Sequence, residues 1–139
     1  MPIDGFLKID GIEGECKDTG HEGWLDVTGF DWGLSQEANP GTDGKLVGGT
    51  PTVRSAQFTQ PFGRASPRLF ISCAMGHQFP GMTLEGRLNY GKEKFTYLRA
   101  QFKDCLITSV QTQSTEAQIT EEVEVVFRSV NVETWERPL

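Results

Sequence analysis

Three cysteines and two histidines offer the most reactive side chains in the sequence. A zinc site would need four of these side chains to converge, although none has the paired spacing typical of zinc ligands. An odd number of cysteines without a CxxC pair instead indicates free, reduced thiols. We therefore expect no metal and no cofactor to be bound by the following residues: Cys16, His21, Cys73, His77 and Cys105.

Cys73 and His77 are four residues apart, a spacing that allows a thiol–imidazole pair for nucleophilic catalysis at a helix end. The residues around Cys73 are apolar, and such surroundings raise the pKa of a thiol and disfavour the reactive thiolate. The sequence contains no GxSxG, GxxxxGKS, GxxxxGKT or GxGxxG pattern. We expect no catalytic residue and no enzymatic activity; a small thiol or metal enzyme using Cys73 and His77 remains an alternative.

Acidic residues occur in pairs, and paired carboxylates can hydrolyse glycosidic bonds when a cleft holds them face to face. Glu121 and Glu122 are neighbours on an expected strand, so they point to opposite faces and cannot act on one bond. We expect these two residues, and the group Asp10, Glu13 and Glu15, to lie on solvated strand and turn surfaces.

Aromatic residues raise the possibility of a sugar-binding platform. Phe30 and Trp32 lie on one face of one expected strand, and Trp24 and Trp135 could extend that surface. Large aromatic side chains more often fill a core, and we expect core packing here. A carbohydrate-binding β-sandwich built on Trp24, Phe30 and Trp32 remains an alternative function.

The chain has 139 residues, and we expect residues 1–139 to form a single domain. Lys and Arg number 13 against 19 Asp and Glu, and the formal charge of −6 argues against nucleic-acid binding. The longest segment without charged residues, 69–84, is too short and too broken by Gly, Pro and polar residues to cross a membrane. The first residues also lack the basic and apolar regions of a signal peptide.

Alternation of apolar and polar residues with a period of two predicts strands with one buried face. A strand is also expected over 25–35, which is rich in Val, Thr, Phe and Trp. After Phe127 the apolar phase moves to Val130 and Val132, and this change predicts a β-bulge or a strand that crosses between two sheets. The alternation occurs in the following segments: 3–9, 84–90, 95–102 and 123–127.

One short helix is expected over about 66–76. Ser66 is a suitable N-cap, Pro67 suits the first helical position and Gly76 suits the end of the helix. Leu69, Phe70, Cys73 and Ala74 fall on one face, which we expect to plug an open end or side of a β-barrel, with Cys73 as a small buried hydrophobe.

The segment 38–52 is rich in Gly and Pro and is expected to be a long extended loop. Loops of this length inside compact domains are usually functional. Lys45, Leu46 and Val47 form a short β-like island within it, and a Leu-Val pair flanked by glycine is expected to dock onto something. The pattern leaves two alternatives open: contact with another subunit, or folding back onto the chain's own barrel.

Taken in order along the whole chain, these features resemble the Hcp (haemolysin co-regulated protein) family, the inner-tube proteins of bacterial type VI secretion systems. A Gly-rich loop and a helix from Ser66-Pro67 to Gly76 follow in the family order. The N-terminal residues that carry the resemblance are Asp4 to Ile9, Gly11 to Glu15, Lys17-Asp18, His21, Asp26-Val27, Trp32-Gly33 and Ser35-Gln36. The C-terminal ones are Lys103-Asp104, Thr120 to Val123 and Phe127.

The resemblance implies a mainly β fold, namely a compact β-barrel of two sheets with one helix. It further implies hexameric rings that stack into a tube. The long loop differs most from the family, and its own pattern makes Lys45, Leu46 and Val47 the candidate inter-subunit contacts. The sequence departs from the family at Cys16, where many members have Ser, and at Asp31, where a small polar residue is common. Asp31 is a candidate lumen-facing residue, and an acid there would change which cargo is tolerated.

Partners and location are also implied by the resemblance. The expected partners are further copies of the chain, effector proteins in the lumen, and the sheath and spike components of the secretion machine. The chain is expected in the bacterial cytoplasm and then outside the cell, because the secretion machine itself exports the tube. No nucleic-acid partner and no membrane insertion are expected.

Overall fold

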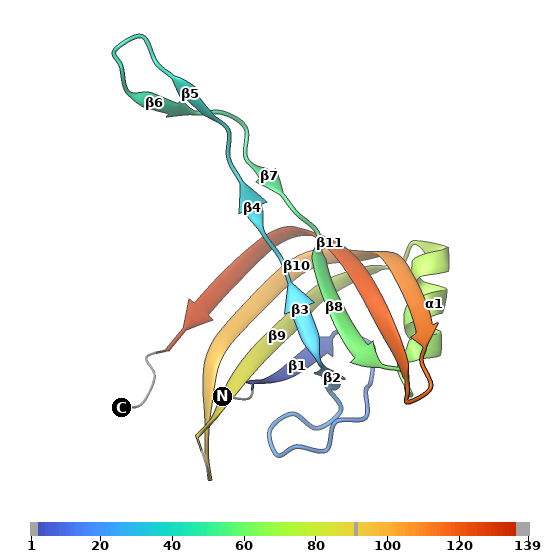
Figure 1. The fold of residues 1–139 in the computed structure, drawn as a ribbon. Coiled ribbons are helices and arrows are strands. Elements are labelled where there is room, and N and C mark those ends of the chain that lie inside the picture. The colour runs from blue at the N-terminus through green and yellow to red at the C-terminus, as the bar shows by residue number, and fades with distance from the viewer. Residues whose placement is uncertain (1–2, 91, 136–139) are drawn as a thin grey trace.

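The computed structural model describes residues 3–90 and 92–135, and it is dominated by one curled sheet (Figure 1). Seven strands form this sheet in the order β2-β1-β9-β10-β11-β8-β3, and two short ribbons pair β4 with β7 and β5 with β6. All paired strands run antiparallel. The strands are β1 (Ile3–Ile9), β2 (Leu25–Val27), β3 (Gly29–Asp31), β4 (Leu34–Ser35), β5 (Ala38–Pro40), β6 (Leu46–Gly48), β7 (Thr52–Val53), β8 (Ala56–Pro61), β9 (Gln78–Tyr90), β10 (Glu93–Ser114) and β11 (Ile119–Thr134).

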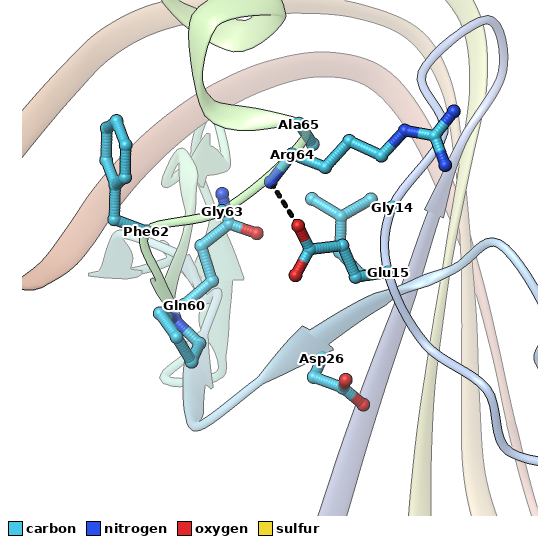
Figure 2. A pocket seen from close by; sticks show the side chains of 10 residues that line it. Gly14, Glu15, Asp26, Gln60, Phe62, Gly63, Arg64 and Ala65 are labelled. Carbon is cyan, nitrogen blue, oxygen red and sulfur yellow. Dashed lines mark hydrogen bonds between the residues drawn. The ribbon is translucent and has the colours of Figure 1, made fainter.

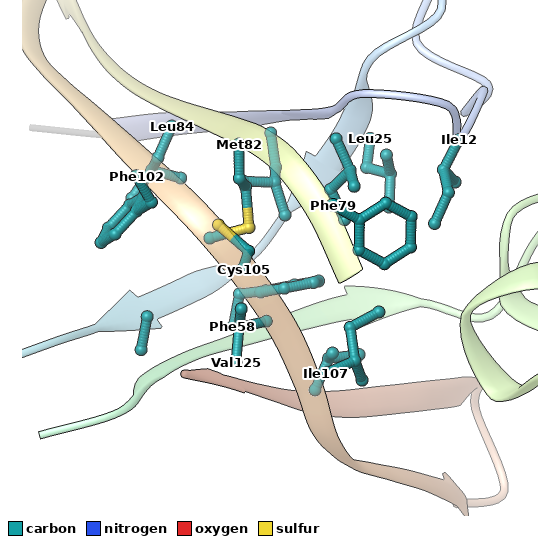
Figure 3. Close-up of a cluster of buried hydrophobic side chains, with 14 of the residues drawn as sticks. Ile12, Leu25, Phe58, Phe79, Met82, Leu84, Phe102, Cys105, Ile107 and Val125 are labelled. Carbon is teal, nitrogen blue, oxygen red and sulfur yellow. The ribbon is translucent and has the colours of Figure 1, made fainter. Parts of the chain in front are cut away.

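The core fills the inside of the curled sheet. Alternate residues of the long strands point inward, as the period-two pattern predicts, and Phe102 and Leu7 are 1% exposed. Figure 3 shows this cluster of apolar side chains converging from several strands. The mainly β barrel expected from the sequence is confirmed. The buried residues of this apolar cluster include Leu25, Phe58, Phe79, Met82, Leu84, Cys105, Ile107 and Val125.

Residues 25–31 join the two ends of the sheet. β2 pairs with β1, and β3 pairs with β8 at the other end of the strand order. Thr28, between them, donates its backbone N–H to the carbonyl of Thr59 at 2.8 Å. The strand expected over 25–35 is therefore three short strands, since it changes partner at Thr28 and leaves the barrel after Asp31.

The change of apolar phase in β11 falls where this strand passes Asp104 of β10, between the pairs Lys103↔Ser129 and Cys105↔Phe127. Asp104 has φ 54, the positive-φ conformation that L-residues seldom adopt. On either side of it the inward positions of β10 shift from Phe102 to Cys105, while β11 stays paired with β10 throughout. Of the two expected possibilities, crossing to another sheet is wrong. Val130 and Val132 end up on the surface, 37% and 47% exposed.

The single helix of the described chain, α1 (Ser66–Met75), lies at one end of the barrel (Figure 1). Gly76 ends it in the left-handed conformation, as predicted. The expected N-cap is wrong: Ala65 holds that position, and the Ser66 hydroxyl accepts the Gly63 backbone N–H at 3.0 Å. The expected inward face is wrong in part, since Leu69 is buried and Cys73 half-buried whereas Phe70 and Ala74 are exposed.

Candidate functional site

A two-part ribbon projects from the barrel, and we call residues 34–53 the arm (Figure 1). β4 pairs with β7 near the barrel, and β5 pairs with β6 toward the tip. The long loop expected over 38–52 is thus largely a β-hairpin. Two further backbone hydrogen bonds hold the ribbon together. Gly49 N donates to Glu37 O at 3.0 Å between the two strand pairs, and Arg54 N donates to Gly33 O at 2.9 Å on the barrel side of the β4–β7 pair.

The tip of the arm is a tight turn between β5 and β6. Gly41 N donates to Lys45 O at 2.6 Å, and the Asp43 carboxylate accepts the Lys45 N–H at 3.0 Å. A side chain at Gly41 would approach Lys45 O and the Val47 side chain to 2.9 Å, and Gly44 has φ 83. The glycines therefore allow the chain to reverse here.

The arm presents apolar side chains to solvent. Leu46 is 76% exposed and Val47 is 53% exposed, and Lys45 beside them is exposed as well. Figure 1 shows the arm pointing away from the barrel, so the alternative in which it folds back is wrong. The three expected contact residues are together at the tip.

Asp31 lies far from that tip, at the base of the arm (Figure 1). It is exposed, ends β3 and pairs in register with Gln57 of β8. The structure therefore places the two sets of predicted site residues in separate regions.

Sequence reasoning missed a polar network on the outer face of the sheet. Residues 10–24 fold over β1 and β9, and His21 is buried there against Phe6, with ring centroids 4.0 Å apart. Its Nδ1 faces Asp18 Oδ2 at 2.8 Å and its Nε2 faces Glu85 Oε1 at 2.6 Å. A hydrogen bond pairs each ring nitrogen with a carboxylate.

Two arginines extend this network along β9 and β10. Arg87 donates to Asp18 and to Asp4, both at 2.9 Å, and Arg99 donates to Glu85 at 2.8 Å. The partners come from β1, the 10–24 segment, β9 and β10. The network therefore fixes the 10–24 segment onto the sheet.

The same segment also contacts the chain that leads into α1. Figure 2 shows Arg64 donating its backbone N–H to Glu15 Oε1, at 2.8 Å, beside a cavity of about 70 Å³. Gly14 passes so close to the backbone of Trp24 that a side chain at this position would overlap the Trp24 carbonyl. Residues 10–24 are thus a packed element rather than a free loop.

Known proteins share this sequence and architecture. The family model described as "Type VI secretion system effector, Hcp" matches residues 6–134. Protein Hcp1 of Pseudomonas aeruginosa is 32% identical over 135 residues, covering 96% of this chain and 83% of that protein.

This chain belongs to the Hcp family.

Solved Hcp structures agree with this assignment. Hcp1 from Salmonella typhimurium has 29% identity and a TM-score of 0.82, covering 96% of this chain and 88% of that one. A type six secretion system protein has 25% identity and a TM-score of 0.87, covering 96% and 84%. The chain is a tube subunit of a type VI secretion system, as the resemblance implied. Hcp proteins are structural proteins secreted by such systems.

In this Hcp chain the aromatic residues do not assemble into the sugar-binding platform that was the alternative to core packing. Phe30 and Trp32 stack at 5.9 Å and pack against the core, where Trp32 meets the edge of Phe102, so core packing is confirmed. Trp24 lies instead against His21, and Trp135 lies under the Arg99 guanidinium.

Glu121 and Glu122 of β11 point to opposite faces as expected, but only one of them lies on the solvated surface. Glu122 is exposed and Glu121 points to the opposite face, so the two cannot act together. The expected solvated surface is wrong for Glu121, which is 1% exposed and accepts a hydrogen bond from Gln60 Nε2 at 2.8 Å.

The thiols do not form a site with the histidines. His77 lies edge-on to Phe79 at 4.8 Å, and among residues 3–90 and 92–135 no three His, Cys, Asp or Glu side chains are grouped to hold a metal. The cysteines are free; Cys16 and Cys105 are buried, and Cys73 is half-buried. Within the described chain, no helix is long and apolar enough to span a membrane.

Thiol reactivity is expected to follow this burial. Burial raises the pKa of Cys16 and raises that of Cys105 to about 11, leaving about one thiolate in a thousand at pH 8 for the latter. In Ellman's assay the folded Hcp chain should titrate at most one thiol quickly, Cys73, and all three after unfolding in urea. Fast reaction of Cys105 in the folded chain would contradict the buried placement.

Acid should weaken the polar network. The His21 hydrogen bond lowers the pKa of Asp18; burial alone would raise the pKa of Glu85, but hydrogen bonds from His21 and Arg99 outweigh it and lower that pKa. Carboxylates with lowered pKa values stabilise the fold above their ordinary values of 3.8 and 4.5, and this stabilisation is lost as pH falls. The unfolding free energy in urea should therefore drop below about pH 4.5, and Glu85→Gln should flatten the drop.

Proposed function

We propose that this Hcp chain assembles into hexameric rings that stack into a tube, and that Lys45, Leu46 and Val47 make contacts between subunits. The observation that carries the proposal is the exposed apolar tip of the arm, with Leu46 76% exposed. An arm that leaves its own barrel and ends in apolar side chains favours contact with another molecule.

An open strand edge supports self-association as well. β8 pairs with residues 120–125 of β11, and beyond Val125 no strand among residues 3–90 and 92–135 pairs with this edge of β11. Val126, Val130 and Val132 are exposed on this second half. Because an exposed apolar edge is prone to pair with another chain, we infer that a neighbouring subunit covers it. Closed rings need such head-to-tail contacts between different surfaces.

The tube would carry small effector proteins in its lumen, toward which Asp31 would point. Its outer partners would be the sheath and spike components of the secretion machine. We propose that the chain, one domain over residues 1–139, leaves the bacterial cytoplasm through this machine and acts as a structural protein rather than an enzyme.

Charge should control stacking. Six chains at −6 each carry −36 formal charges, so stacked rings repel one another unless acidic and basic patches meet. Screening by salt reduces this repulsion. We expect stable rings that stack weakly in dilute solution and lengthen as salt is raised.

The deciding experiment is the mass in solution, measured by size-exclusion chromatography with light scattering at near-physiological salt. A species near six times the chain mass of 15.4 kDa supports the ring. A monomer at high protein concentration would refute the proposal. Sedimentation across a salt series then tests stacking, and tubes that lengthen as salt is lowered would contradict the charge argument.

A further inference from the structure

The outward face of α1 is apolar, which is unusual for a surface helix. Phe70 is 62% exposed, Ile71 56% and Met75 78%, while Leu69 on the inward side is fully buried. A helix on the surface of a monomer normally turns polar side chains to water, and a helix that is apolar on all sides is normally covered. The outward face of α1 therefore needs a partner.

The charge around this face is positive. Arg68 lies on the same face as Ile71 and Met75, because these residues follow the three- and four-residue spacing of a helix. The guanidinium of Arg64, just before the helix, already pairs with Glu13 at 3.6 Å, so the positive charge of this face is that of Arg68; α1 itself contains no Asp or Glu. The face would suit a partner that combines apolar side chains with a carboxylate.

The tip of the arm has this combination. Leu46 and Val47 are its exposed apolar side chains, and the carboxylate of Asp43 lies in the adjoining turn. Glu37 is a second acidic residue of the arm, whose basic residue is Lys45, so the arm has a net negative charge. The tip thus matches α1 in apolar character and is opposite to it in charge.

The two surfaces cannot meet within one chain. In Figure 1 the arm projects away from the barrel on one side, and α1 covers the barrel at the other side. Complementary surfaces on opposite sides of one molecule are what a repeating head-to-tail contact requires.

We propose that the arm tip of one copy docks on the outward face of α1 of a second copy. Leu46 and Val47 pack against Phe70, Ile71 and Met75, and the carboxylate of Asp43 faces Arg68. This inference rests on the proposed assembly and names the surface that receives the arm.

The test is crosslinking in the assembled protein. Val47→Cys and Met75→Cys are introduced together on a Cys73→Ser background, where the two native thiols that remain are buried. A short bis-maleimide should then link the tip of each chain to α1 of the next and give a ladder of trimers and larger species on a denaturing gel. Each single variant has one reactive position, so it should stop at the dimer.

A matched control pairs Val47→Cys with Lys103→Cys, which places the second thiol on an exposed residue of β10. Crosslinking of this control variant should give no species larger than the dimer. A similar ladder in both pairs, or no ladder in an assembly of hexameric mass, would overturn docking on α1 while leaving the ring intact. A protein that stays monomeric before crosslinking would overturn both the docking and the assembly.

Discussion

Replacing Leu46 by Asp is expected to abolish assembly while the barrel remains folded. Leu46 lies in β6 of the arm and is 76% exposed, so the barrel loses no core contact. In an interface, however, the new carboxylate would be buried without a partner at a cost of about 3 kcal/mol or more. A cost of that size weakens each contact by about a hundredfold, and a ring repeats the contact at every subunit.

Light scattering at matched protein concentration measures this effect, and thermal unfolding followed by circular dichroism verifies the fold. Leu46→Met is the matched control, because it keeps an apolar side chain of similar size and should assemble like the parent. Should Leu46→Asp show the parent's mass, the arm tip would not be an assembly element.

The barrel could be predicted from the sequence because its signal is local and repeated. Each long strand alternates apolar and polar residues, and Leu84 and Phe102 are inward as the pattern predicts. The arm could not be predicted as a hairpin, because β5 contains Asn39 and Pro40, which have low strand propensity. Its pairing depends instead on the turn that Gly41 and Gly44 permit.

The polar network could not be predicted from local sequence patterns. Glu85 and Arg87 occupy the polar phase of β9, and alternation alone places such residues in solvent. They are covered because residues 10–24 return over the sheet and bring His21 to Glu85, 64 residues away in sequence. A histidine in an otherwise polar, glycine-rich segment was the one available signal, and it does not indicate which residues the histidine contacts.

The face of α1 that packs inward could not be predicted from the sequence either. Apolar residues occupy both sides of this ten-residue helix, so the pattern does not select one inward face. We expected Phe70 and Ala74 to be inward beside Leu69, whereas Ser66 and Ser72 take those positions. The choice makes sense when α1 has a second partner, because the larger apolar side chains are then kept for that contact.

The largest loss of stability is expected from Glu85→Ala, because this carboxylate joins the two halves of the network. Its side chain is 9% exposed and accepts hydrogen bonds from His21 at 2.6 Å and from Arg99 at 2.8 Å. Removing one member of a buried charge network leaves its partners uncompensated and costs about 3–5 kcal/mol. Urea unfolding at neutral pH should show a loss of this size in the free energy of unfolding.

Two further variants separate the network from a general effect of losing a carboxylate. Glu122→Ala removes an exposed carboxylate from β11 and should change the free energy of unfolding by less than about 0.5 kcal/mol. His21→Ala combined with Glu85→Ala should cost less than the sum of the two single losses, because the pair is in direct contact. Additive losses, or a loss below about 1 kcal/mol for Glu85→Ala, would mean that water compensates these charges as it does for surface ion pairs. In that case segment 10–24 would be held to the sheet by the packing of Phe6, His21 and Trp24 rather than by charge.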